Sequence, residues 1–201
     1  MTANRNFRTL ILLCLSISII DCGGGGGGTA PAVSGVLDFK NPGFELPVLA
    51  AGTNAEPLSP AYVWTGEPGL GVANGNSDWG TAAEAGSQYA FLQSSYVNVY
   101  QQGSCQQTVS GFTIGQSYEV TFWMAQRTGL FPTAGTAVSL TANSTVIFPA
   151  TLPTADGNWK QFTSTPFIAT KGSYTFEFLA AVPLSGTNQA TLLDEVHIVE
   201  P

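Results

Sequence analysis

The sequence predicts an all-β protein of the two-sheet sandwich or jelly-roll class. Its 201 residues include 23 glycines and 12 prolines, and only 9% of them are charged. Gly, Thr, Ser, Val and aromatic residues dominate, a composition typical of short strands joined by dense turns and unlike that of a helical bundle. No long stretch has the spacing of an amphipathic helix. The length suits a single β domain.

Alternation of apolar and polar residues predicts most of the strands. Residues 118–127 and 173–180 alternate most clearly, so their aromatic side chains are predicted to face inward. The other predicted strands cover residues 88–93, 105–109, 136–142, 144–148, 159–167 and 191–199. The segment 46–85 is rich in Gly, Pro and Asn and lacks a strand pattern, so we expect a long functional loop there.

The first 35 residues have the pattern of an export signal followed by a tether. Arg5 and Arg8 precede an apolar run over residues 10–20, which is too short to span a bilayer. The run ends at Cys22 and six glycines follow. This pattern resembles a bacterial lipoprotein signal, although Asp21 stands where that signal has a small residue. Three alternatives stay open: lipidation of Cys22, an ordinary signal peptide in which Cys22 is incidental, and an uncleaved anchor.

These observations set the expected domain boundaries and location. The signal occupies residues 1–21, the lipidated Cys22 and glycine-rich tether occupy 22–35, and one β-sandwich occupies 36–201. The chain is expected to be exported, as a membrane-anchored lipoprotein or cell-surface protein and otherwise as a periplasmic or secreted one. Contact with the membrane is expected only through the lipid anchor, and the domain is expected to be a monomer.

The charge balance excludes nucleic acid as a partner. Six Lys and Arg stand against thirteen Asp and Glu, giving a formal net charge of −7. Beyond the signal the only cations are Lys40, Arg127, Lys160 and Lys171. Four scattered cations cannot neutralise a phosphate backbone or form a polybasic membrane patch.

The cysteines predict neither a disulfide framework nor a zinc site. Cys14 lies in the apolar run and Cys22 at the lipidation position, which leaves Cys105 alone. Cys105 is predicted to be a small buried apolar residue. A catalytic thiol is not expected, because His197 is the only imidazole in the chain.

A series of short motifs resembles the galactose-binding-domain-like jelly-roll family, which includes carbohydrate-binding modules related to families 4, 9 and 22. The motifs lie at residues 41–45 (NPGFE), Trp64, 71–75 (GVANG), 88–93 (QYAFLQ), 107–112 (QTVSGF), 115–118 (GQSY), 122–127 (FWMAQR), 172–178 (GSYTFEF) and 192–196 (LLDEV). They span nearly all of residues 36–201. The resemblance implies a jelly-roll sandwich, most often with carbohydrate as its ligand.

The same resemblance implies a structural calcium ion that ties the first strand to the last. Asn41, Glu45 and Asp194 match the family positions that supply its oxygen ligands, although Glu195 stands where many relatives have a second Asp. Calcium prefers several carboxylate and carbonyl oxygens, so the set is chemically sensible. The alternative is that Glu45 is a solvated carboxylate and Asp194 a turn residue.

Sugar recognition requires a flat aromatic platform beside hydrogen-bonding side chains. The predicted carbohydrate-binding residues are Trp79, Gln93, Tyr96, Trp123 and Arg127. Trp64 and Trp159 are interpreted as packing residues instead. Trp123 has a second interpretation, burial beneath the long loop, and Arg127 has one as the ion-pair partner of Glu119.

The sequence predicts a non-catalytic domain that binds poly- or oligosaccharide. The alternative is a surface-structural or adhesive lipoprotein that contacts protein or matrix, and a polysaccharide-active enzyme is not expected. The acids of the long loop, Glu56, Glu67, Asp78 and Glu84, have no spacing that indicates a glycosidase pair, and nothing brings His197 to Arg127 as in a lyase.

Overall fold

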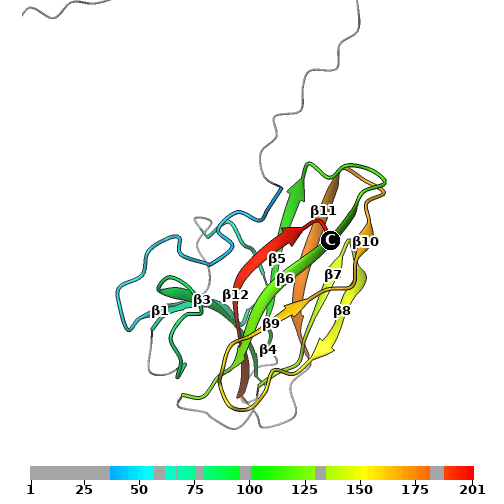
Figure 1. Ribbon diagram of the computed structural model, residues 1–201. Helices are drawn as coiled ribbons and strands as arrows, with labels where there is room; N and C mark the ends of the chain where they lie inside the picture. The colour runs from blue at the N-terminus through cyan, green and yellow to red at the C-terminus, as the bar shows by residue number, and fades with distance from the viewer. Residues whose placement is uncertain are drawn as a thin grey trace, which may run out of the picture. The chain divides into compact units, whose positions relative to one another are not determined.

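Two antiparallel β-sheets make up the protein in the computed structural model, which describes residues 37–56, 62–66, 68–75, 79–95, 101–129, 135–181 and 188–201 (Figure 1). These ranges contain no α-helix, and they fall within the compact unit Ser34–Pro201. The predicted all-β class is therefore confirmed. The signal, the tether and Cys22 lie outside the described residues.

The larger sheet has eight strands. Its main path runs in the order β1 (Asn54–Ala55), β2 (Leu70–Asn74), β3 (Gln88–Ser95), β12 (Asn188–Val199), β6 (Ser117–Gln126) and β10 (Phe167–Ile168). Off this path, β4 (Gln101–Gln102) pairs with β3 and β9 (Lys160–Thr163) pairs with β6. The last strand of the chain thus lies between β3 and β6.

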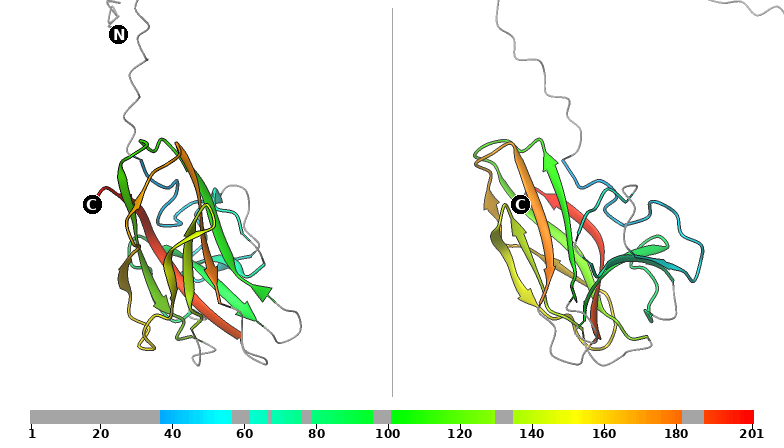
Figure 2. Two further views of the ribbon diagram at one scale, coloured as in Figure 1. Left: turned by 90° about the vertical axis from the view of Figure 1, so that its right-hand side faces the viewer. Right: turned by 180° about the vertical axis from the view of Figure 1, so that it is seen from behind.

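The smaller sheet has four strands and covers one face of the larger sheet. Its order is β5 (Ser104–Ser110), β11 (Ser173–Ala180), β7 (Val138–Ala142) and β8 (Thr145–Thr151). Figures 1 and 2 show these strands as a second layer beside β12 and β6. This two-layer arrangement is the predicted sandwich.

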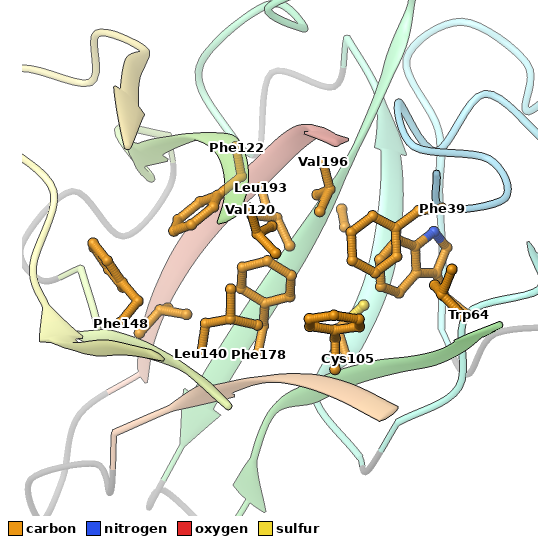
Figure 3. Close-up of a cluster of buried hydrophobic side chains, with 14 of the residues drawn as sticks. Phe39, Trp64, Cys105, Val120, Phe122, Leu140, Phe148, Phe178, Leu193 and Val196 are labelled. Carbon is orange, nitrogen blue, oxygen red and sulfur yellow. The ribbon is translucent and has the colours of Figure 1, made fainter. Parts of the chain in front are cut away.

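The main core fills the space between the sheets. Figure 3 shows Val120, Phe122 and Leu193 of the larger sheet facing Leu140 and Phe178 of the smaller one. Alternate residues of β6 are buried here and the residues between them are half-buried, as the sequence predicted. Burial on this scale, at about 1.5–3 kcal/mol per large apolar side chain, stabilises the domain without a disulfide.

Two single residues of the core bear out the sequence analysis. Trp64 is 1% exposed, as expected for a packing residue. Cys105 is fully buried, and its burial raises the thiol pKa well above 9.0. Both side chains belong to the main cluster drawn in Figure 3.

The segment 46–85 differs from its prediction, because it contains β1 and β2. Four of the five residues of β2 are buried, so both faces of this strand are covered and its sequence does not alternate. A second difference is that the predicted strand 159–167 is divided between β9 and β10. No helix in the described residues is long and apolar enough to cross a membrane.

A β-bulge in the last strand shapes the candidate site. The register between β12 and β6 shifts between Asp194, which pairs with Trp123, and His197, which pairs with Thr121. Glu195 and Val196 together stand opposite Phe122 there, and Glu195 has a φ of +47°. Asp194 and His197 consequently lie on the same face of the sheet although three positions separate them.

Candidate functional site

The outer face of the larger sheet, which points away from the main core, carries a second apolar cluster. Alternation along β3, β6 and β12 sends every other side chain to this face. The buried residues of the cluster are Ala73, Trp79, Tyr89, Phe91, Ala125, Ala190 and Leu192, and Ala83 and Trp159 pack against them. Because these side chains are buried, the accessible part of the outer face lies beside the cluster and not on it.

Trp79 is inserted between two side chains of this face. Its ring stacks on Phe91 with a centroid separation of 3.7 Å, and Arg127 Cζ lies 4.0 Å from the Trp79 ring centroid. Two groups this close cannot share one face of the indole, so they occupy opposite faces. Trp79 is 5% exposed and is not the free platform that the sequence predicted. The reason is that Phe91 and Arg127 cover the two faces of its ring.

Residues 79–87 form a strap that crosses the outer face and is fixed along its length. The Thr128 backbone N–H donates to Trp79 O (3.3 Å), and the Thr128 hydroxyl donates to Gly80 O (3.2 Å). Further along, Tyr89 Oη donates to Thr81 O (3.1 Å) and Trp159 Nε1 donates to Ala82 O (2.8 Å).

Two acidic side chains hold the far end of the strap. Asp194 Oδ2 accepts hydrogen bonds from the backbone N–H groups of Glu84 (3.0 Å) and Ala85 (3.3 Å). Glu45 Oε1 accepts from the N–H groups of Ser87 (2.7 Å) and Gln88 (2.8 Å). Asp194 is fully buried, and this burial raises its pKa to about 8 against the opposing effect of the backbone donors.

The predicted calcium ligands are tied to different partners. Asn41 Oδ1 accepts from the Leu46 N–H (3.0 Å) and Asn41 Nδ2 donates to Leu46 O (2.8 Å), so this amide closes its own turn. Glu45 and Asp194 instead hold the strap. Among the described residues, no three His, Cys, Asp or Glu side chains are grouped so as to hold a metal ion. Calcium binding stays a prediction that melting curves in calcium and in chelator would test.

The exposed part of the outer face lies over β6 and β9. Trp123 of β6 is half-buried and pairs across strands with the exposed Gln161 of β9. Trp159 precedes β9, is half-buried and meets Tyr89 edge to face at a centroid separation of 5.7 Å. Trp123 and Trp159 are thus aromatic side chains of this face that remain partly open to solvent.

The other predicted sugar-binding residues have different surroundings. Gln93 of β3 is half-buried, and its Nε2 donates to Asn188 Oδ1 at 2.6 Å. Arg127 is 5% exposed beneath the strap. Tyr96 lies outside the described residues. The structure therefore brings Trp79, Gln93, Trp123 and Arg127 to one face of the sheet. Of the two predicted tryptophans, Trp123 is the more accessible.

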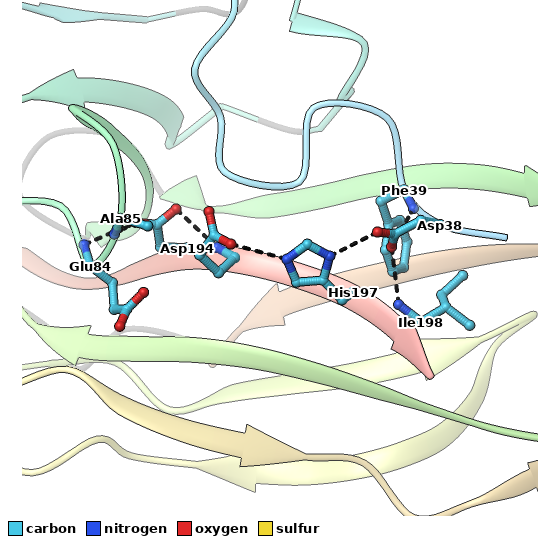
Figure 4. Close-up of polar contacts among 8 residues, drawn as sticks. Asp38, Phe39, Glu84, Ala85, Asp194, His197 and Ile198 are labelled. Carbon is cyan, nitrogen blue, oxygen red and sulfur yellow. Dashed lines mark hydrogen bonds and ion pairs between the residues drawn. The ribbon is translucent and has the colours of Figure 1, made fainter. Parts of the chain in front are cut away.

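A polar cluster follows the bulge on the same outer face. His197 Nδ1 lies 2.8 Å from Asp38 Oδ2, and His197 Nε2 lies 3.0 Å from Glu195 Oε2. Figure 4 shows Asp38 and His197, with Asp194 of β12 and the strap residues Glu84 and Ala85 beyond them. Burial would lower the His197 pKa, but the hydrogen bonds and charges of Asp38 and Glu195 raise it above 6.5. We refer to Asp38, His197 and Glu195 as the His197 cluster.

The sequence did not indicate the role of Gln161 or the His197 cluster, whereas Trp159 packs on the outer face as expected and is in addition partly exposed. Asp38 is 159 residues from His197, and no local pattern indicates that the two meet. A signal was present for Gln161, because it alternates with Phe162 in a predicted strand. The pairing of β9 with β6 is what places Gln161 beside Trp123.

Comparison with known proteins identifies the fold. No protein-family model matches the chain, and a search of curated proteins found no match. Among solved structures, the Stig cyclase Fisc from Fischerella sp. TAU, in complex with (3Z)-3-(1-methyl-2-pyrrolidinylidene)-3H-indole, gives a TM-score of 0.61 at 19% identity. That match covers 81% of this chain and 95% of the cyclase. The carbohydrate-binding module TmCBM61, in complex with β-1,4-galactotriose, gives a TM-score of 0.50 at 16% identity, covering 81% of this chain and 97% of the module.

These similarities show a shared jelly-roll-type fold and correct one expectation. The sequence predicted that the chain is not an enzyme, because no pattern of catalytic residues is visible in it. Cyclases from Fischerella have the same fold, one of them in complex with 4-(1H-indol-3-yl)butan-2-one at a TM-score of 0.58. The fold is therefore compatible with catalysis, and the prediction of a non-enzyme does not hold.

Proposed function

We propose that this protein binds poly- or oligosaccharide on the outer face of its larger sheet, with Trp123 as the aromatic platform. The observation that carries the proposal is the position of Trp123. It is half-buried whereas Trp79 and Phe91 of the same face are buried, and its cross-strand neighbour is the exposed Gln161. An aromatic ring next to neutral hydrogen-bonding groups is the surface on which a sugar ring packs.

Neighbouring residues support this assignment. Thr121 precedes Trp123 by two positions on the same face, and its cross-strand partner is the exposed Thr163. Trp159 extends the aromatic surface beyond Gln161, while its bond to Ala82 holds its ring in place. A rigid platform loses little side-chain entropy when a ligand binds. The fold shared with a module that was solved with galactotriose is consistent with this use of the face.

A glycan array probed with the full chain tests the proposed function. We expect the folded protein to bind a limited group of the glycans on the array. A folded protein that binds no glycan on the array would contradict the proposal.

A second candidate function, contact with protein or matrix, is favoured by an apolar surface elsewhere. Leu46, Val48 and Val63 are 57%, 79% and 41% exposed. Asn41 Nδ2 is within hydrogen-bonding distance of both Leu46 O and Tyr62 O, so the two loops that carry these residues are adjacent. Val63 also has a φ of +57°, a strained value for a β-branched residue. An adhesive protein would lose binding to matrix when Leu46 and Val48 are changed to Ser, whereas glycan binding would be unaffected.

A further inference from the structure

The His197 cluster lies beside the proposed platform. His197 pairs with Thr121 across β12 and β6, and Trp123 is the next residue of β6 on the same face. Diagonal neighbours of this kind lie about 7–8 Å apart, within reach of one ligand for an aromatic and a long polar side chain. A sugar ring on Trp123 would therefore have the cluster at its edge.

The backbone around the bulge fixes the position of the Glu195 side chain. The bulge gives this residue a positive φ, which costs free energy for any residue other than glycine. A side chain at position 43 would obstruct it, because a Cβ on Gly43 would lie 2.6 Å from Glu195 Oε1. The Val196 N–H donates to Pro42 O (3.1 Å) and fixes the approach of the two segments.

The cluster offers hydrogen-bond acceptors to a ligand. The side chains of His197, Asp38 and Glu195 are 35%, 26% and 30% exposed. Asp38 Oδ1 already accepts from the N–H groups of Phe39 (2.8 Å) and Ile198 (3.1 Å). Glu195 binds His197 through Oε2, while its Oε1 lies toward Gly43. The side chain is 30% exposed, so its carboxylate can also accept a hydroxyl proton from a ligand.

The charge of the cluster is negative in either state of the histidine. Two carboxylates stand against at most one positive charge, and Glu119 adds another acid on this face of β6. Arg127 shares this face but is 5% exposed beneath the strap, and Lys160 of β9 pairs with Met124, which belongs to the opposite, core-facing side. A ligand that carries carboxylate or sulfate groups would be repelled, whereas sugar hydroxyls would donate to the carboxylates.

We infer that the His197 cluster is the polar half of the ligand site and selects uncharged glycans over acidic ones. This inference rests on the proposed carbohydrate binding and specifies its substrate class. Trp123 supplies the apolar contact and Glu195 the charge-assisted hydrogen bond. Asp38 and His197 hold the Glu195 carboxylate in place.

The test compares matched glutamate variants of the full chain. Binding is measured by titration against neutral galactan, mannan and β-glucan and against the acidic polygalacturonate and alginate. We expect binding to a neutral polymer only, insensitive to added salt, with Glu195→Gln weakening it about tenfold. Glu177→Gln, the same change on the opposite sheet, should leave it unaltered. Asp38→Asn serves as a second variant if Glu195→Gln lowers the melting temperature.

The outcomes separate the inference from the function on which it rests. Binding confined to the acidic polymers, or neutral binding that neither Glu195→Gln nor Asp38→Asn weakens, would overturn the inference and leave carbohydrate binding intact. Absence of binding to every polymer by the folded wild-type chain would overturn the proposed function itself.

Discussion

The Arg127 guanidinium lies 4.0 Å from the centre of the Trp79 ring, and Phe91 closes the opposite face of the same indole at 3.7 Å. This stack joins β3, the strap and the end of β6 across the intervening β12. The first residue of the strap is thereby locked to the sheet. The arrangement distinguishes a structural tryptophan from the half-exposed Trp123.

Replacing Trp79 should therefore weaken the fold. Trp79→Ala removes a buried indole and is expected to lower the free energy of unfolding by about 3–5 kcal/mol. Trp123→Ala, the same change at a half-exposed position, should lower it by much less. Urea denaturation measures both values, and equal losses would contradict the distinction between the two residues.

The strap also depends on Glu45. Glu45→Ala leaves the N–H groups of Ser87 and Gln88 without their acceptor, and Gln88 is fully buried. We expect a loss of about 1–3 kcal/mol in stability and faster hydrogen exchange at these two amides. Glu177→Ala on the opposite sheet is the control. Unchanged exchange at Ser87 and Gln88 would show that the carboxylate does not hold the strap.

The strands were predictable from the sequence where one face is buried. In β6 and β11 a buried side chain follows each half-buried or exposed one, and the period of two is visible in the sequence. β2 was not predicted because it is buried almost throughout.

The site was predictable only in part. Gln93, Trp123 and Arg127 share a face because β3, β12 and β6 are adjacent, and this order is set by long-range packing. The sequence shows which residue types a site contains more readily than how exposed each side chain is. For this reason Trp79 was predicted to be an open platform although it is buried.

Stability should depend on pH through His197. Its pKa is raised above 6.5 in the folded protein by Asp38 and Glu195, so the folded state binds the proton more tightly than the unfolded chain does. The resulting stabilisation is complete below pH 6.5 and is lost as the pH rises through the raised value. Melting temperatures of the wild type and His197→Gln should therefore differ more at about pH 6 than at about pH 9. A difference that does not change with pH would contradict this assignment.

Cys105 should be unreactive in the folded protein. Its thiol is fully buried and its pKa is raised well above 9.0, so almost no thiolate is present at neutral pH. Iodoacetamide should alkylate Cys105 only after the protein is unfolded in urea, as peptide mass mapping would show. Rapid labelling under native conditions would mean that the main core opens at β5.

We propose that a glycan binds on Trp123 of the outer face. The dissociation constant of Trp123→Ala for a polymer that the wild type binds tests this proposal. We expect the affinity to fall at least about tenfold, as is usual for a central aromatic contact, while the melting temperature changes little. Val146→Ala, at a residue 59% exposed on β8 of the other sheet, should bind like the wild type. An unchanged dissociation constant for Trp123→Ala would contradict the proposed position of the glycan.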